Sequence, residues 1–230
     1  MNYAYLRNPP RLLHRLTGVL GTSAERVACR KTERCFMDRL HQMPAGALRP
    51  LFLVVGGFMD SVRGHAYAIC RNCPPDVAHR CDLFYRHYTE PEDVQELLRL
   101  YHRKGLPTIL IGHSWGADLA VNLVARKHAI PVDLLVTLDP VSRKRQLRTP
   151  CPTIRQWVNI YVDYNQATWF NITNLVARIG GPWSPVPAAH DNIRCPKEFP
   201  HSAAESMFRT FALSSVRMLL DHSMSARTRR

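Results

Sequence analysis

The sequence predicts an α/β fold: a mostly parallel, doubly wound sheet of about five strands with helices on both faces. Short apolar runs of strand length alternate along the chain with longer segments of helical periodicity, which is the pattern of a parallel sheet with crossover helices. The chain has 230 residues, of which 46% are hydrophobic and 21% charged, so it suits one globular domain with a sizeable core.

Five segments are expected to form the strands. Leu51–Val55, Thr108–Ile111 and Val132–Leu138 are mostly apolar, as in strands that are buried on both faces of a sheet. Asp82–Tyr88 alternates polar and apolar residues, and Trp157–Val162 is a further short strand. Ligands of parallel sheets bind at the carboxyl ends of the strands, so the chemistry is expected directly after these segments.

Three helices are expected between and after these strands. One begins at Thr89–Glu92, with Thr as the cap and Pro in the first turn, and it ends at Gly105. Gly116–Lys127 is apolar on most sides, as in a helix that packs against a sheet. The last helix begins at the capping box Ser202–Glu205, after a long Pro-rich loop over Gly180–Pro200.

The chain is strongly basic, with 31 Lys and Arg residues against 18 Asp and Glu, so its formal net charge is +13. This charge favours anionic surroundings such as lipid headgroups or an acidic partner. No helix-turn-helix, zinc-finger or aromatic RNA-binding pattern accompanies it, so nucleic-acid binding is not expected.

Residues 1–46 are predicted to be a basic N-terminal segment, with a helix over Arg11–Arg30, and residues 47–230 the main domain. The stretch Leu12–Leu20 is broken by a His and an Arg, so it is a poor signal-peptide core. The longest apolar stretch, Leu51–Met59, has 9 residues, whereas a membrane-spanning helix needs about 20. We therefore expect no transmembrane segment, and a chain that is cytoplasmic or exported without a Sec signal.

The seven cysteines are an odd number, and their disulfide state stays open from the sequence. Cys70 and Cys73 have the C-x-x-C spacing, but a zinc site would need a second close pair and only Cys81 is near. Free thiols are expected over disulfides, and no metal site is expected.

The sequence Gly112-His-Ser-Trp-Gly116 carries the chemistry. It has the pattern G-x-S-x-G between a predicted strand and a predicted helix, which is the context of a nucleophile elbow. In such a turn Ser114 has strained backbone geometry and an exposed Oγ, and the two glycines leave space where a side chain would clash. The amide of Trp115, at the helix start, faces the negative charge that develops during attack on a carbonyl.

Together with two other turns, this elbow resembles the α/β-hydrolase superfamily, and within it the lipases and esterases, over roughly residues 51–220. Gly57-Phe-Met-Asp60 is similar to the His-Gly-Phe turn of lipases, which implies that the amide of Phe58 is the second oxyanion-hole donor beside Trp115. Leu138-Asp-Pro140 resembles the Leu-Asp-Pro sequence of pancreatic-type lipases, in which the Asp is the acid of the catalytic triad.

The resemblance implies a triad of Ser114, Asp139 and His201, in the chain order of the hydrolase fold. The imidazole removes the proton of the weakly nucleophilic serine, and the carboxylate fixes the imidazole tautomer. Two alternatives stay open. Asp163 follows the strand after which most α/β-hydrolases carry the acid, and His190 is the alternative base.

The chain departs from larger members of the family. Few residues precede the first strong strand, and no long insertion separates Ser114 from Asp139, so the fold is expected to be a minimal α/β-hydrolase without a cap domain. Only the segments Gln146–Arg155 and Trp169–Pro200 could cover the entrance of its site.

The resemblance implies a serine hydrolase of carboxylic esters that needs no cofactor and no metal, with lipid or phospholipid acyl esters as the expected substrates. The basic residues Arg143, Lys144 and Arg145 follow the presumed acid, so they are expected at the rim of the site and indicate peripheral contact with an anionic membrane. A non-catalytic binding protein with this fold is an alternative, as is a thioesterase or acyltransferase with the same triad.

Overall fold

The computed structural model describes residues 37–58, 60–125, 129–143, 149–165 and 172–227. The chain forms two compact units, Met1–Arg49 and Pro50–Arg230. In the first unit, residues 37–42 are helical and Ala45–Ala47 form a short 3-10 helix (η1). The helix predicted over Arg11–Arg30 lies outside the described residues.

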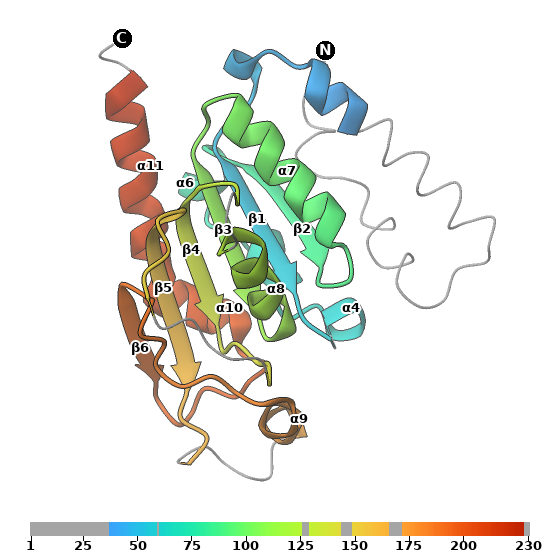
Figure 1. Cartoon of the computed structure of the whole chain (residues 1–230), viewed down its shortest axis with the longest axis vertical. Helices are drawn as coiled ribbons and strands as arrows, with labels where there is room; N and C mark the ends of the chain where they lie inside the picture. The colour runs from blue at the N-terminus through green and yellow to red at the C-terminus, as the bar shows by residue number, and fades with distance from the viewer. Residues whose placement is uncertain (1–36, 59, 126–128, 144–148, 166–171, 228–230) are drawn as a thin grey trace, which may run out of the picture. The chain divides into compact units, whose positions relative to one another are not determined.

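The second unit is built on a parallel sheet whose strand order is β2-β1-β3-β4-β5-β6 (Figure 1). Every neighbouring pair of these strands is parallel. The chain adds β2 on one side of β1 and then continues from β3 on the other, so the order reverses between β1 and β3, where such sheets bind ligands. The strands are β1 Leu51–Gly56, β2 Asp82–His87, β3 Thr108–His113, β4 Val132–Leu138, β5 Ile154–Val162 and β6 Asp191–Cys195.

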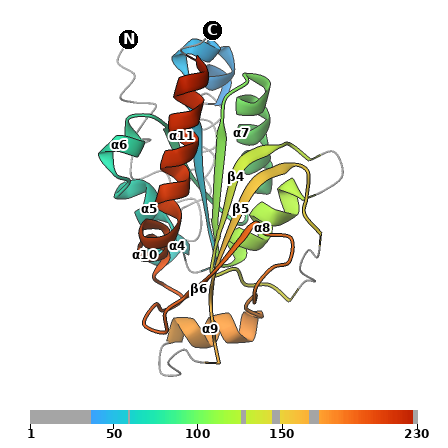
Figure 2. The same cartoon turned by 90° about the vertical axis from the view of Figure 1, so that its left-hand side faces the viewer.

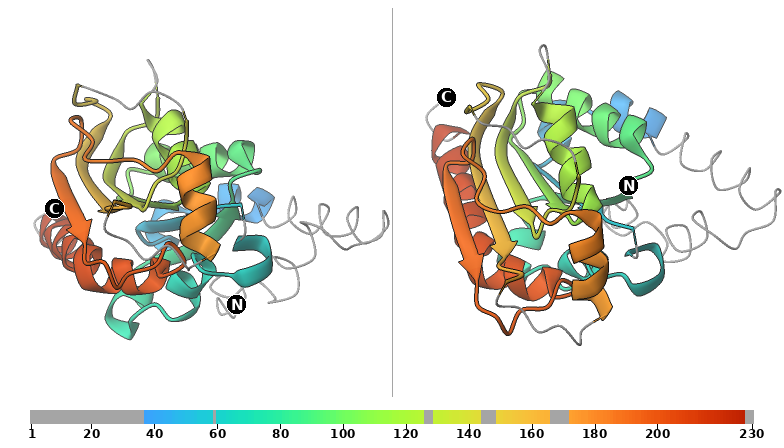
Figure 3. Two further views of the ribbon diagram at one scale, coloured as in Figure 1. Left: turned by 90° about the horizontal axis from the view of Figure 1, so that it is seen from below. Right: turned by 60° about the horizontal axis from the view of Figure 1, so that its bottom comes forward.

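Helices cover both faces of this sheet, with α7 and α8 on one face and α5, α6, α10 and α11 on the other (Figure 2). Two further helices, α4 and α9, lie beyond the carboxyl ends of the strands (Figure 3). The helices are α4 Asp60–Arg63, α5 Tyr67–Arg71, α6 Pro75–Ala78, α7 Pro91–Arg103, α8 Trp115–Val124, α9 Ile172–Gly180, α10 Ala204–Met207, the π-helical η2 Phe208–Ala212 and α11 Leu213–Arg227.

The predicted class, a parallel α/β sheet with helices on both faces, is confirmed, but the count of about five strands is wrong. The sheet has a sixth strand, β6, at its edge beside β5. Four of its five residues are exposed or half-buried, because an edge strand has one neighbour and little apolar cover. Its sequence, Asp-Asn-Ile-Arg-Cys, therefore lacks the apolar run by which the inner strands are recognised.

Two predicted helix caps are also wrong by one residue. The cap of α7 is Glu90 and not Thr89, and the cap of α10 is Ala203 and not Ser202. Neither cap residue makes a side-chain hydrogen bond to the first turn. The carboxylate of Glu90 instead accepts the amide of His87 at 2.7 Å, which closes the turn between β2 and α7.

The core explains why the inner strands read as apolar segments. Every residue of β1 and β3 is buried. Five apolar residues of α7 are buried as well: Val94, Leu97, Leu98, Leu100 and Tyr101. Among the described residues, no helix has the length and apolar character needed to cross a bilayer. The five described cysteines are free thiols, at positions 70, 73, 81, 151 and 195.

Candidate active site

Ser114 lies in the sharp turn between β3 and α8. Its backbone has φ 55° and ψ −125°, a region that side-chain-bearing residues rarely adopt. The turn is held by its neighbours, since the amide of Ser114 donates to the carbonyl of Leu138 at 3.1 Å, and its own carbonyl accepts the amide of Ala117 at 3.0 Å. This geometry directs the hydroxyl away from the sheet at the carboxyl end of β3.

The two glycines of the turn are required by close contacts. A Cβ on Gly112 would lie 2.5 Å from the Cα of Ala117, and a Cβ on Gly116 would lie 2.2 Å from the carbonyl oxygen of Val55. The first contact lets the chain turn sharply into α8, and the second lets α8 pack directly on β1. Both neighbouring atoms belong to the backbone, which cannot move aside as the end of a flexible side chain would. A larger residue at either position would therefore clash.

Gly116→Ala is therefore expected to lower the free energy of unfolding by about 3 kcal/mol or more, at the upper end of overpacking effects. The added methyl would have to push α8 off the backbone of β1. Urea denaturation of the full chain measures this effect. The control is Gly46→Ala, because a Cβ there would meet nothing within 4 Å. Equal denaturation midpoints for the two variants would contradict the prediction.

The structure brings together the three residues that were predicted as a triad. The Oγ of Ser114 lies 2.9 Å from the Nε2 of His201, and the Nδ1 of His201 lies 2.6 Å from the Oδ2 of Asp139. All three side chains are buried. An ionised carboxylate only accepts hydrogen bonds, so Nδ1 carries the proton towards Asp139 and Nε2 is left to accept from the hydroxyl of Ser114.

Asp139 is fully buried directly after β4, with a positive φ of 41°. Its Oδ1 accepts the amide of Val162 at 3.2 Å, and its Oδ2 accepts the hydroxyl of Tyr164 as well as the imidazole of His201. Burial and the neighbouring carboxylate raise the pKa of Tyr164 far above its usual value, so the phenol stays a donor. The sequence analysis missed Tyr164, since no local pattern connects it to Asp139.

His201 is held through its backbone as well as its ring. Its amide donates to the Oδ1 of Asn174 in α9 at 2.8 Å, and its carbonyl accepts the Nε2 of His113 at 2.8 Å. Burial, together with the neighbouring His201, lowers the pKa of His113 to about 4. His113 is therefore neutral near pH 7, with its proton on Nε2, and it holds the loop of His201 without adding charge to the site.

The two predicted oxyanion-hole residues flank Ser114. Trp115 is the first residue of α8, so its amide has no acceptor within the helix. Phe58 follows Gly57, and a Cβ on Gly57 would lie 3.2 Å from the Oγ of Ser114. The aromatic rings of Phe58 and Trp115 contact each other, with centroids 5.2 Å apart. The backbone segments that carry the amides of Phe58 and Trp115 therefore both lie next to the hydroxyl of Ser114.

A pocket of about 100 Å³ opens above Ser114, and its exposed lining is mostly apolar. The segment after β1, the end of β3 with the turn at Ser114, one side of α9 and the loop of His201 contribute to it. Its lining residues are Gly57, Phe58, Asp60, Arg63, His65, His113, Ser114, Ile172, Thr173, Val176, His201 and Ser202.

The alternative acid and base make other contacts. Asp163 forms an ion pair with Arg194 at 3.4 Å and accepts the amide of Asn165. His190 lies just before the amino end of β6, and its Nδ1 accepts the amide of Trp157. Ser114 instead follows the carboxyl end of β3, so the two residues are at different ends of parallel strands.

Of the predicted basic rim, Arg143 donates twice to the carbonyl of Ile179, at 3.2 and 2.8 Å, near the end of α9. Lys144 and Arg145 lie outside the described residues. Among the described residues, His, Cys, Asp and Glu side chains nowhere gather into a metal-binding group of three or more.

No protein-family model and no curated protein matches this chain. Among solved structures, the chain is similar to the crystal structure of a protein from Xanthomonas campestris pv. campestris that is provisionally described as a hydrolase of the alpha/beta superfamily. The identity is 13%, the TM-score is 0.42, and the match covers 77% of this chain and 99% of that one. This likeness is too distant to indicate a common activity, so the function has to be inferred from the site.

Proposed function

We propose that this protein is a serine hydrolase that cleaves carboxylic esters. The observation that carries the proposal is the continuous line of hydrogen bonds from the Oγ of Ser114 through the ring of His201 to the carboxylate of Asp139. A serine in a strained elbow, an imidazole within 2.9 Å and a buried carboxylate beyond it are the parts that activate a hydroxyl as a nucleophile.

In the first step, the Oγ of Ser114 attacks the ester carbonyl while Nε2 of His201 takes its proton. The imidazolium that forms is stabilised by the carboxylate of Asp139, to which Nδ1 still donates. The carbonyl oxygen becomes negatively charged, and the amides of Phe58 and Trp115 stabilise it. The tetrahedral intermediate then expels the alcohol, which receives the proton from Nε2, and the acyl group stays on Ser114.

In the second step, a water molecule attacks the acyl-enzyme. His201 removes one proton from this water, the oxyanion forms again at the same two amides, and the Oγ of Ser114 leaves with the proton from Nε2. The carboxylic acid is released and the enzyme returns to its starting state. Each step thus uses His201 once as a base and once as an acid.

The lining of the pocket favours an apolar acyl group, because Phe58, Ile172 and Val176 all border it. Lipid or phospholipid acyl esters are therefore the proposed substrate class. A thioesterase or an acyltransferase would use the same hydrogen-bonded residues, and the identity of the leaving group and of the acceptor distinguishes these reactions from ester hydrolysis.

A fluorophosphonate probe tests the proposal on the full chain, because it reacts covalently with activated serines. Intact-mass spectrometry is expected to show one adduct per chain, and peptide sequencing to locate it on Ser114. p-Nitrophenyl esters of increasing chain length then report turnover and acyl preference. An unlabelled protein, or an adduct on a different residue, would contradict the proposal and favour a binding protein with this fold.

A further inference from the structure

Helix α9 presents its apolar residues outward, the reverse of an ordinary surface helix. Its buried residues are Asn174 and Ala177, which face the rest of the domain. Four large apolar side chains are exposed instead: Ile172 by 66%, Leu175 by 44%, Val176 by 43% and Ile179 by 62%. A surface helix of a globular protein normally buries such residues and exposes its polar ones.

The exposed side of α9 continues into the rim of the pocket. Ile172 and Val176 line the pocket, and Phe58 and Trp115 are themselves exposed by 51% and 37%. Trp115 borders the end of α9, since a Cβ on Gly180 would lie 3.5 Å from its indole nitrogen.

These six residues, which we call the α9 face, include all but one of the large apolar side chains that the described part of the chain exposes. The α9 face consists of Phe58, Trp115, Ile172, Leu175, Val176 and Ile179. The remaining exposed residue is Met218, on α11. Exposed apolar residues gathered in one place indicate a surface that meets another apolar phase or partner.

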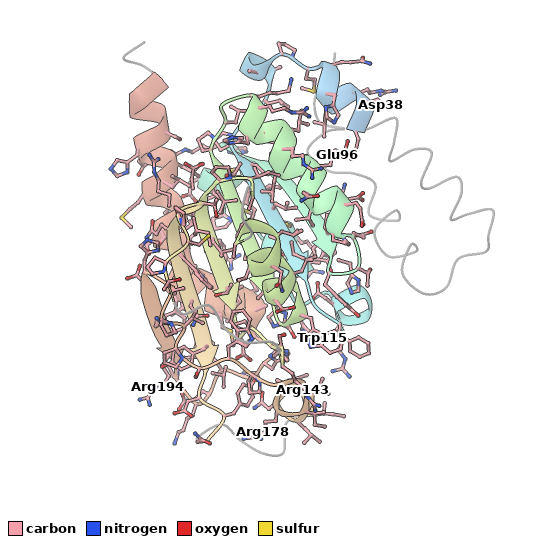
Figure 4. The ribbon with its side chains drawn as sticks, viewed as in Figure 1. Asp38, Glu96, Trp115, Arg143, Arg178 and Arg194 are labelled. Atoms are coloured by element: carbon pink, nitrogen blue, oxygen red, sulfur yellow. The ribbon has the colours of Figure 1, made fainter. Side chains whose placement is uncertain are left out.

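Basic residues lie beside the α9 face. Arg143, Arg178 and Trp115 are grouped around the helix in Figure 4. The guanidinium of Arg143 donates to the carbonyl of Ile179, beside the end of the apolar side chains. Helix α9 itself has one basic residue, Arg178, and no acidic residue, and Arg63 lies in the lining of the adjoining pocket.

We propose that the α9 face is a docking surface for an anionic lipid bilayer. A helix that lies in the bilayer interface inserts its apolar side among the headgroups, with cations beside it near the lipid phosphates. Trp115 is suited to this depth, because its ring is apolar and carries one polar N–H. A second copy of the chain is a poorer partner, because the same positive charges would face each other across the contact.

The inner side of α9 determines which substitutions can test this proposal. Asn174 holds the amide of His201 at 2.8 Å, and Arg178 donates to the carbonyl of Tyr164 at 2.7 Å. Changes on that side would disturb the site as well as the surface. Leu175 and Ile179 are one helical turn apart on the outer side and do not line the pocket, so they can be changed without altering it.

The experiment measures binding of the full chain to vesicles, with Ser114→Ala in every protein so that no lipid is consumed. Cosedimentation compares vesicles of phosphatidylcholine with vesicles that contain one part of phosphatidylglycerol in three. The test variant is Leu175→Ser with Ile179→Ser, and the matched control is Met218→Ser, which removes an equally exposed apolar side chain from α11. Binding is thus measured without any dependence on ester hydrolysis.

The parent and the Met218 variant are expected to bind the anionic vesicles, and the double variant to bind them at least tenfold more weakly, because two apolar side chains no longer enter the interface. Equal binding of the double variant and the parent to the anionic vesicles would overturn the proposal. So would a parent protein that binds vesicles of phosphatidylcholine alone as tightly as it binds the anionic vesicles. A concentration-dependent dimer in solution that the double variant abolishes would assign the α9 face to a second copy instead.

Discussion

Replacing Ser114 with alanine is expected to lower kcat for ester hydrolysis by about 10⁶-fold, the size of the loss when a triad nucleophile is removed. Without Oγ no acyl-enzyme forms, and only the oxyanion-hole amides and substrate binding remain. His201→Ala is expected to cause a loss of similar size, because the hydroxyl 2.9 Å away then has no base. Turnover of a p-nitrophenyl ester measures both losses.

The decisive comparison is the double variant Ser114→Ala with His201→Ala. Residues that act as one unit are not additive, so the double variant is expected to be no slower than the single variants, within about threefold. Ser214→Ala is the matched control, since it removes an exposed hydroxyl from α11 and is expected to keep the parent rate. Losses that multiply in the double variant would show that the two residues do not act together.

Asp139→Asn is expected to lower kcat by about 10⁴-fold, while Asp163→Asn leaves it nearly unchanged. An amide at position 139 would present an N–H to Nδ1 of His201, which turns the imidazole to the tautomer that cannot accept the proton of Ser114. With the amide nitrogen in the place of Oδ2, the carbonyl of the new residue can still accept the amide of Val162. Asp163 is engaged with Arg194 and contributes no atom to the lining of the pocket.

These two variants decide between the acids that the sequence left open. Circular dichroism and urea denaturation establish whether each variant is folded before the rates are compared. Loss of activity in the Asp163 variant together with retention in the Asp139 variant would reverse the assignment. It would also mean that the 2.6 Å contact between Asp139 and His201 does not support catalysis.

The residues that the sequence analysis missed share one property: their surroundings are made by distant parts of the chain. Strand β6 has no apolar run, because it lies at the edge of the sheet. Helix α9 lies in the segment Trp169–Pro200, which was expected to be a loop that could cover the entrance, and its apolar residues are on the side away from the core. Tyr164 and Asn174 are ordinary polar residues until the fold brings them to Asp139 and His201.

By itself the sequence determined the parallel α/β class, the inner strands and the turn at Ser114, because these depend on apolar runs and on glycine at particular positions, which are local properties. Only the tertiary structure decided which histidine meets Ser114 and which carboxylate meets that histidine. These contacts join residues 87 and 62 positions apart, and they depend on the order in which the sheet assembles its strands. No local pattern encodes that order, because the apolar residues of a strand indicate that it is buried but not which strand lies beside it.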